Sequence, residues 1–296
     1  MKNIKSKLGY VVLVLTVLVF AWYLRSNPAV IDNLSTTRLS TVLVLLALYG
    51  LMTAVLAYIF GLMLKMCNAH IPAKENILFT MYSSVINFFG PLQSGPGFRL
   101  VYLKKKFNVS MRAYGGANVV YYLMFAAISG LFLLSSLIPV VLLVIAAVAA
   151  APFGWYVLPA LRKRVPRLRK VLPDLPSIGI FVQLGCATLV QLLLVTCVYW
   201  VELRSLESTI SFSQALTYAG AANFALFVSL TPGALGFRES FLFLSERLHG
   251  IDNATVVSAN VLDRAVYVLF LGILFAIILA MHGQRKFSQF KQPKSD

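Results

Sequence analysis

The sequence predicts an all-α polytopic membrane protein with about six full spans and two re-entrant helical hairpins, arranged as inverted repeats. Composition is the first observation behind this prediction: of 296 residues, 59% are hydrophobic and 12% charged, whereas soluble domains carry about 25% charged residues. The second observation is a series of apolar runs, several longer than the roughly 18 residues that indicate a membrane span. The third is an internal repeat built around two Gly/Pro breaks.

Six apolar runs predict the full spans. They cover about Leu8–Leu24, Leu39–Leu64, Tyr114–Leu137, a run from Pro139 to about Leu161, Ile178–Val201 and Ala254–Met281. The first run follows three lysines, as the apolar part of a signal peptide would, but it is long and no A-x-A site follows, so we expect a retained span. After the fifth span, a polar loop is expected at Glu202, Arg204 and Glu207.

Two further apolar segments run into Gly/Pro-rich breaks. Asn76–Pro91 enters Gly90–Arg99 (G-P-L-Q-S-G-P-G-F-R), and Phe212–Leu230 enters Ser229–Glu239 (S-L-T-P-G-A-L-G-F-R-E). Proline lacks a backbone donor and glycine is conformationally permissive, so a helix should break at each place. In lipid such a break survives only when it is buried in protein or lines a wet cavity. We therefore expect re-entrant hairpins, in which short helices follow the breaks at Phe98–Asn108 and Phe241–Leu248.

The distribution of positive charge predicts the orientation. If both hairpins turn back, the N-terminus, residues 65–112, residues 162–170 and the tail share one side and hold 20 of the 26 Lys and Arg residues. Five lie on the other side, which fits the positive-inside rule with both termini cytoplasmic in a multi-pass protein of the cell membrane. The net charge of +16 does not indicate nucleic acid, because the basic clusters flank apolar spans. Such clusters also suit anionic lipid head groups.

Three sequence matches, in the same order, predict the internal repeat. The pairs are Tyr82-x4-Asn87-Phe88 with Tyr218-x4-Asn223-Phe224, Gly97-Phe98-Arg99 with Gly236-Phe237-Arg238, and Ala117-Asn118-Val119 with Ala259-Asn260-Val261. On the charge-based topology the two halves are inverted, as in transporters whose broken segments meet near the bilayer midplane. The alternative is that these matches arise by chance, because apolar segments use few residue types.

We expect one membrane domain over residues 1–296. Its segments are a first span and loop (1–38), a first repeat (39–137), a linking span and basic loop (138–177), a second repeat (178–281) and a basic cytoplasmic tail (282–296).

Polar residues in the last span are the first candidates for function. A charge at bilayer depth costs roughly 2.5–3.5 kcal/mol, so Asp263 and Arg264 should face the bundle interior. Asn260, Asp263, Arg264 and Tyr267 are spaced i, i+3, i+4, i+7, which places them on one helix face. They form either a structural ion pair that fixes helix packing or a polar wall of a head-group cavity.

Arginines that directly follow the breaks are the second set. Arg99 and Arg238 lie beside freed backbone donors, an arrangement suited to a phosphate, unless they only cap the hairpins and snorkel. Glu239 could hold Arg238 or take part in proton coupling. A head group is thus expected between the hairpin tips. The predicted substrate-binding residues are Arg99, Pro232, Gly233, Gly236, Arg238, Glu239, Asn260, Asp263, Arg264 and Tyr267.

Other chemistries find little support in the sequence. His70, His249 and His282 fit no metal spacing, and Cys67, Cys186 and Cys197 are expected to be packing residues. The sequence has no phosphate-binding G-x-x-x-x-G-K loop, no nucleophile elbow and no H-E-x-x-H motif. No cofactor or metal is expected.

Two motifs carry a resemblance to a known family. P-G-A-L-G-F-R-E at 232–239, followed by Leu262-Asp263-Arg264, resembles the second signature of the flippase-like membrane region of bacterial lysyl-phosphatidylglycerol synthases. G-P-G-F-R-L-V-Y-L-K-K-K at 95–106 is similar to the first signature. The resemblance covers about Leu39–Met281. The chain departs from the family where Gly95–Phe98 replace a frequent Gly-Glu pair and Tyr121-Tyr122 replace a Glu-Arg pair.

The resemblance implies movement of a lipid with a charged head group between leaflets. It points to the residues of the second signature and to Arg99. In the full synthases a soluble aminoacyltransferase domain follows the membrane region, and because none follows here we expect no synthase activity. A transporter of a small soluble anion and a membrane-embedded enzyme acting on a lipid-linked substrate remain alternatives. Expected partners are membrane lipids, anionic or phosphate-bearing; the oligomeric state stays open, a homodimer included.

Overall fold

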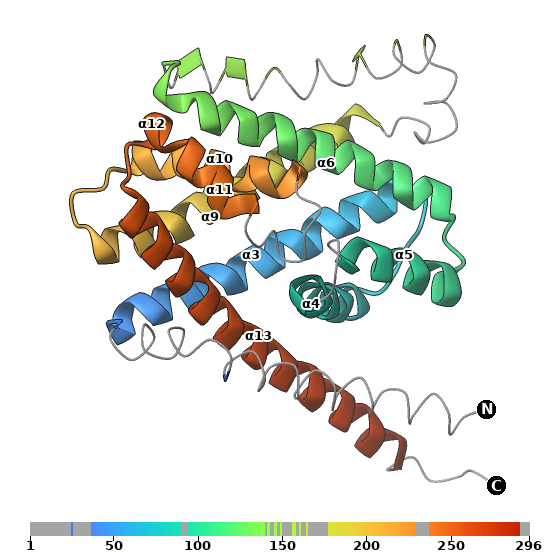
Figure 1. Ribbon diagram of the computed structural model, residues 1–296. Helices are drawn as coiled ribbons and strands as arrows, with labels where there is room; N and C mark the ends of the chain where they lie inside the picture. The colour runs from blue at the N-terminus through green and yellow to red at the C-terminus, as the bar shows by residue number, and fades with distance from the viewer. Residues whose placement is uncertain are drawn as a thin grey trace, which may run out of the picture.

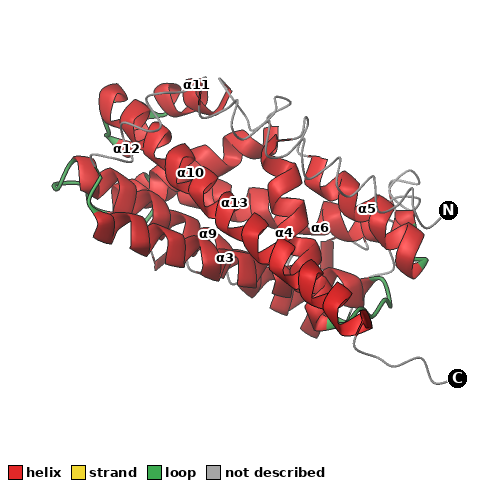
Figure 2. Cartoon of the chain, turned by 90° about the horizontal axis from the view of Figure 1, so that it is seen from below, coloured by secondary structure: helices red, strands yellow, loops and turns green. Residues whose placement is uncertain are grey.

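The computed structural model describes residues 37–89, 94–139, 177–228 and 237–290, with isolated positions at 25 and between 141 and 164. Every regular element in these ranges is a helix (Figure 1, Figure 2). The predicted span at 8–24, most of the predicted span at 139–161 and the centres of both Gly/Pro breaks lie outside the described residues.

The helices follow the same order in both halves of the chain. In the first half they are α3 (Leu39–Met66), α4 (Ala73–Phe89), α5 (Ser94–Phe107), α6 (Met111–Leu133) and a 3₁₀ turn, η2 (Leu134–Ser136). In the second half they are α9 (Ile178–Leu206), α10 (Phe212–Val228), α11 (Phe237–Leu244), α12 (Glu246–His249) and α13 (Asn253–Phe290). Each half thus has a long helix, a 17-residue helix, a shorter helical segment and another long helix.

Four described helices are long and apolar enough to cross a membrane. They are Leu39–Met66, Met111–Ser136, Ile178–Leu206 and Asn253–Met281, and they coincide with four of the six predicted spans. The 17 residues of α4 and of α10 correspond to about 25 Å of helix. That length is shorter than the hydrocarbon core of roughly 30 Å, and both helices reach the ends of their described ranges, at residues 89 and 228.

The long helices α3 and α9 lie side by side and run in opposite directions (Figure 1). Phe60 and Met63, near the end of α3, share a buried cluster with Phe181 and Leu184 near the start of α9. α6 and α13 also run in opposite directions in the view of Figure 1. Since α3 and α9 begin the two halves, equivalent helices of the halves point in opposite directions.

The helices α4 and α5 form a hairpin that is held at both ends. Near the break, Ser94 Oγ donates to the Ile86 carbonyl over 3.1 Å, and Gly95 N–H donates to Asn87 Oδ1 over 3.3 Å. A Cβ at Gly95 would lie 2.8 Å from Ser83 Oγ, so the two helices approach too closely there for a larger residue.

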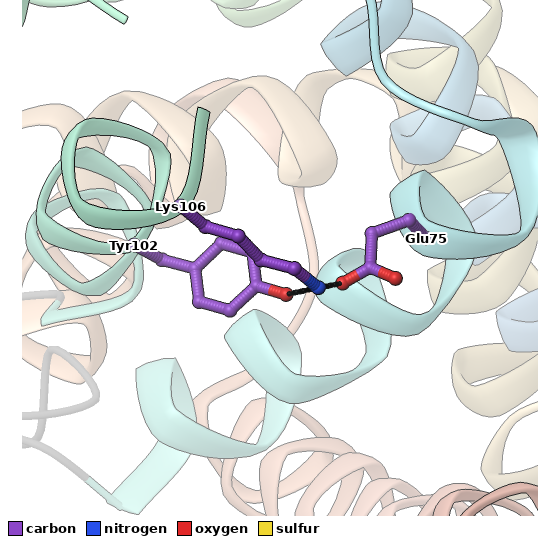
Figure 3. Close-up of polar contacts among 3 residues, drawn as sticks. All are labelled: Glu75, Tyr102 and Lys106. Atoms are coloured by element: carbon purple, nitrogen blue, oxygen red, sulfur yellow. Dashed lines mark hydrogen bonds and ion pairs between the residues drawn. The ribbon is translucent and has the colours of Figure 1, made fainter. Parts of the chain in front are cut away.

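The open end of the same hairpin carries a polar cluster. Glu75 on α4 pairs with Lys106 on α5 and also accepts from the Tyr102 hydroxyl (Figure 3). Lys106 Nζ in turn donates to Tyr102 Oη over 2.9 Å. Because contacts exist at both ends, α4 and α5 present a fixed surface to the rest of the bundle.

Candidate functional site

Three long helices bring one hydroxyl and two carboxyl groups together. The Tyr49 hydroxyl on α3 lies 2.7 Å from Asp263 Oδ1 on α13 and 3.3 Å from Glu202 Oε1 on α9. Tyr49 is 3% exposed and Glu202 is fully buried. We call Tyr49, Glu202 and Asp263 the acidic centre. Tyr49 lies 153 and 214 positions from its two partners in sequence, so only the tertiary fold creates the centre.

Aromatic rings enclose the acidic centre. The Tyr49 ring lies 5.1 Å from the Tyr267 ring and 5.5 Å from the Phe270 ring, measured between centroids. The ring of Phe88, next to last in α4, contacts that of Tyr267 in a tilted arrangement, with 5.5 Å between centroids. The end of α4 that leads into the first Gly/Pro break therefore contacts the wall of the acidic centre. Apolar rings around carboxyl groups lower the local dielectric constant and strengthen their interactions with any charge that enters.

Glu202 corrects one sequence-based expectation. The sequence predicted that it begins a polar loop, but α9 continues to Leu206 and buries this side chain completely. A buried carboxyl group needs a hydrogen-bond partner, and the Tyr49 hydroxyl supplies one. Arg204 also lies within α9 and not in a loop, although its side chain is exposed, whereas the exposed Glu207 directly follows the helix.

The four predicted residues of the last span all lie on α13. Asp263 and Tyr267 contact Tyr49, as described above. Asn260 is 4% exposed and donates to the Val256 carbonyl over 3.0 Å, and Arg264 is half-buried. The structure thus brings part of the predicted polar face into the acidic centre.

The second signature lies mostly outside the described residues. This applies to Pro232, Gly233 and Gly236, which precede α11. Arg238 and Glu239 fall on α11, but their side chains are not among those described. The roles of these five residues stay predictions.

Arg99 occupies a different place in the bundle. Its guanidinium carbon lies 3.2 Å from the centroid of the Phe60 ring on α3, and the side chain is 9% exposed. Its electrostatic neighbours are the tyrosines Tyr114, Tyr121 and Tyr122 of α6. A desolvated cation–π contact is worth about 2 kcal/mol, so the ring partly offsets the cost of burying this charge.

The two places are separated along one face of α3. Tyr49 contacts Asp263 and Phe60 contacts Arg99. Eleven residues of helix correspond to about 16 Å and just over three full turns. The described structure therefore does not join Arg99 and Asp263 around one small group, as the sequence led us to expect for a head group between the hairpin tips.

In the predicted repeat, Tyr121 of the first half is equivalent to Asp263 of the second half. Its hydroxyl donates to Gln191 Oε1 on α9 over 2.9 Å. Asp263 likewise bonds across to the long helix of the other half, through Tyr49. The first-half contact is neutral, whereas the second-half contact involves carboxyl groups, so any role that needs an acid falls on the second half.

Within the described ranges, no group of three or more His, Cys, Asp or Glu residues could hold a metal ion.

These features define the class: a polytopic helical membrane protein with a polar centre inside its helix bundle. The long helices have the length and apolarity of spans, and carboxyl groups from two of them are buried beside aromatic rings. The chain belongs to the family described as the lysylphosphatidylglycerol synthase TM region, whose model matches residues 8–274. This match confirms the resemblance inferred from the two signatures and begins earlier, at residue 8. A comparison with curated proteins finds no match.

Proposed function

We propose that the protein is a flippase-like transporter that moves a phospholipid or a lipid carrier with a charged head group between the leaflets. Two observations support this proposal: membership of a membrane family named for lipid chemistry, and the acidic centre, which is the observation that carries it. A polar head group needs partners inside the bilayer, where charged side chains are costly and mostly functional. Tyr49, Glu202 and Asp263 offer such partners between helices of both halves.

The proposed architecture is a pair of inverted repeats in one membrane domain. The recurring helix order and the opposed directions of α3 and α9 support it. Each short helix pair would be a re-entrant hairpin whose tip approaches the bilayer midplane, and the acyl chains would stay in the lipid. Both termini would be cytoplasmic, in the cell membrane. Arg238 and Arg264 would complete the head-group site in the second half, and no aminoacyl transfer would take place.

A proteoliposome assay with a fluorescent phospholipid whose head group carries an ammonium group beside the phosphate tests this proposal, because carboxyl groups accept hydrogen bonds from ammonium. A membrane-impermeant quencher reports how fast the lipid leaves the inner leaflet. Asp263→Asn removes a charged hydrogen-bond partner, worth about 1.5–3 kcal/mol, and should slow translocation about tenfold or more. Glu207→Gln is the matched control, because this exposed carboxyl group follows α9 only five residues after Glu202. Full translocation by Asp263→Asn would remove the acidic centre from the mechanism.

The same preparation separates the proposal from its two rivals. A transporter of a small soluble anion would take up a labelled solute into sealed vesicles without moving lipid. A membrane-embedded enzyme would change a lipid-linked substrate chemically when purified in detergent, where a flippase leaves it unchanged. Either result, together with an unchanged lipid distribution, would replace the flippase proposal.

A further inference from the structure

Arg99 is a buried cation that forms no ion pair with any acidic side chain in the described part of the chain. The side chain is 9% exposed, and its Nε has no hydrogen-bond partner. Its described electrostatic neighbours are three tyrosines, with no carboxyl group among them. Burying a charge is costly unless it is paired and hydrogen-bonded. The nearby carboxyl group of Glu75, on the helix packed against α5, is already engaged by Tyr102 and Lys106 (Figure 3).

The groups around Arg99 are mainly hydrogen-bond donors. The Tyr114 hydroxyl on α6 is 1% exposed; Asn118 on the same helix lies near it, but no partner meets ordinary hydrogen-bond geometry. Phe60 lies over one face of the guanidinium group, and the Nε–H at its edge has no hydrogen-bond partner in the described structure. Guanidinium donates only, and a phenol hydroxyl can donate, so together they match an acceptor with several oxygens. Phosphate is such an acceptor and binds arginine in a bidentate way.

Further positively charged residues lie on the same helix as Arg99, α5. Lys104 and Lys105 are exposed, and Lys106 is 46% exposed, at the end of the helix. Lys106 follows Arg99 by seven residues, which is about 10 Å of helix. A row of one sign of charge raises the local concentration of the opposite charge. The surface therefore favours an anion near the end of α5, and Arg99 is the buried cation on the same helix.

We propose that Arg99, Tyr114 and Phe60 form an anion pocket that binds one phosphate group in the first half of the molecule. This assignment rests on the proposed function, because it takes the phosphate to be part of a lipid head group. A free phosphate ion has the same chemistry, so the test compares the two sources. The pocket is about 16 Å from the acidic centre along α3, which makes it a second binding place on the path of the substrate.

Calorimetric titration of the purified protein in detergent tests the pocket. The ligands are dihexanoyl-phosphatidylglycerol, inorganic phosphate and dihexanoylglycerol, which lacks the phosphate. Arg99→Gln should weaken binding of the phosphate-bearing lipid about tenfold or more, and Arg99→Lys, which keeps the charge but not the bidentate geometry, by less. Tyr114→Phe removes only the hydroxyl group and should weaken binding about fivefold. Arg112→Gln, an exposed arginine at the start of α6, should bind as the wild type does.

Each outcome decides a separate point. Competition by inorganic phosphate would show that the pocket recognises phosphate from either source, and its failure to compete would restrict the ligand to lipid. Binding by Arg99→Gln within about twofold of the wild type, or equal binding of the phosphate-free lipid, would overturn the pocket. If Arg99→Gln does not fold, Tyr114→Phe and Arg99→Lys decide. If the wild-type protein binds the phosphate-bearing lipid but translocates no lipid, only the flippase proposal is rejected. If the wild-type protein translocates lipid and Arg99→Gln binds as tightly as the wild type, only the pocket is rejected.

Discussion

The Tyr49 hydroxyl carries one proton and lies near two carboxyl oxygens. The distance to Asp263 Oδ1 is 2.7 Å, and the distance to Glu202 Oε1 is 3.3 Å. The shorter distance is ideal for an O–H···O hydrogen bond, and the longer one exceeds the usual range. Tyr49 therefore donates chiefly to Asp263, and it links α3 to α13 more strongly than to α9.

Tyr49→Phe tests how much this hydroxyl stabilises the bundle. The ring contacts with Tyr267 and Phe270 are kept, but a buried carboxyl group loses a donor, which costs about 1–3 kcal/mol. We expect a lower midpoint of unfolding in detergent, measured by tryptophan fluorescence during denaturant titration. Tyr58→Phe is the control, since Tyr58 lies on the same helix and is 53% exposed. Equal stability of the Tyr49 variant and the wild type would mean that other groups satisfy Asp263.

The sequence predicted one side of the acidic centre and missed the other. Asp263 and Tyr267 could be found because charge inside an apolar run is conspicuous and helical spacing places polar residues on one face. Glu202 ended an apolar run, which is where a loop normally begins. Its only local hint was Leu203, which continues the buried face of α9. Tyr49 had no signal of its own, because its role depends on partners 153 and 214 residues away.

The helices as elements were largely predictable. The runs Leu39–Leu64 and Ala254–Met281 lie within α3 and α13, because hydropathy is a local property of the chain. The amphipathic helix expected at Phe98–Asn108 is the larger part of α5, which starts four residues earlier. The packing of one helix on another was not predictable, since it depends on contacts between distant segments.

Gly220 marks a tight contact between two helices, which leads to a prediction about stability. A Cβ on this α10 residue would lie 2.6 Å from the carbonyl carbon of Phe132 and 2.7 Å from the Cα of Leu133, in the last turn of α6. Backbone atoms cannot move aside as a flexible side chain can, so Gly220→Ala must push the helices apart. Overpacking of this kind costs about 1–3 kcal/mol.

The measurement is the thermal unfolding midpoint in detergent. Gly130→Ala on α6 is the matched control, because a Cβ there meets nothing within 4 Å. Alanine favours helix over glycine by up to about 1 kcal/mol, so this control should be as stable as the wild type or more so. If Gly220→Ala were equally stable, α10 and α6 would be able to separate without loss, and the tight contact would not hold the hairpin in place.

For the whole molecule, the opposed directions of α3 and α9 have a consequence that can be measured. If both helices cross the membrane, the segments that follow them emerge on opposite sides. The end of α3 leads to the α4–α5 hairpin with Lys104–Lys106, and the end of α9 leads to the start of α10. The positive-inside rule then places the lysines in the cytoplasm and the α9–α10 connection outside.

Single cysteines test this arrangement in intact cells that express the protein. Cys67, Cys186 and Cys197 are first replaced by serine, and a cysteine is then introduced at Lys105 or at Thr209, both exposed. We expect a membrane-impermeant maleimide to label Thr209→Cys from outside, and Lys105→Cys only after the membrane is permeabilised. Labelling of both from the same side would contradict inverted halves, and labelling with the sides exchanged would keep the inversion but reverse the orientation. The result therefore tests repeat symmetry and membrane orientation separately, without relying on any transport activity.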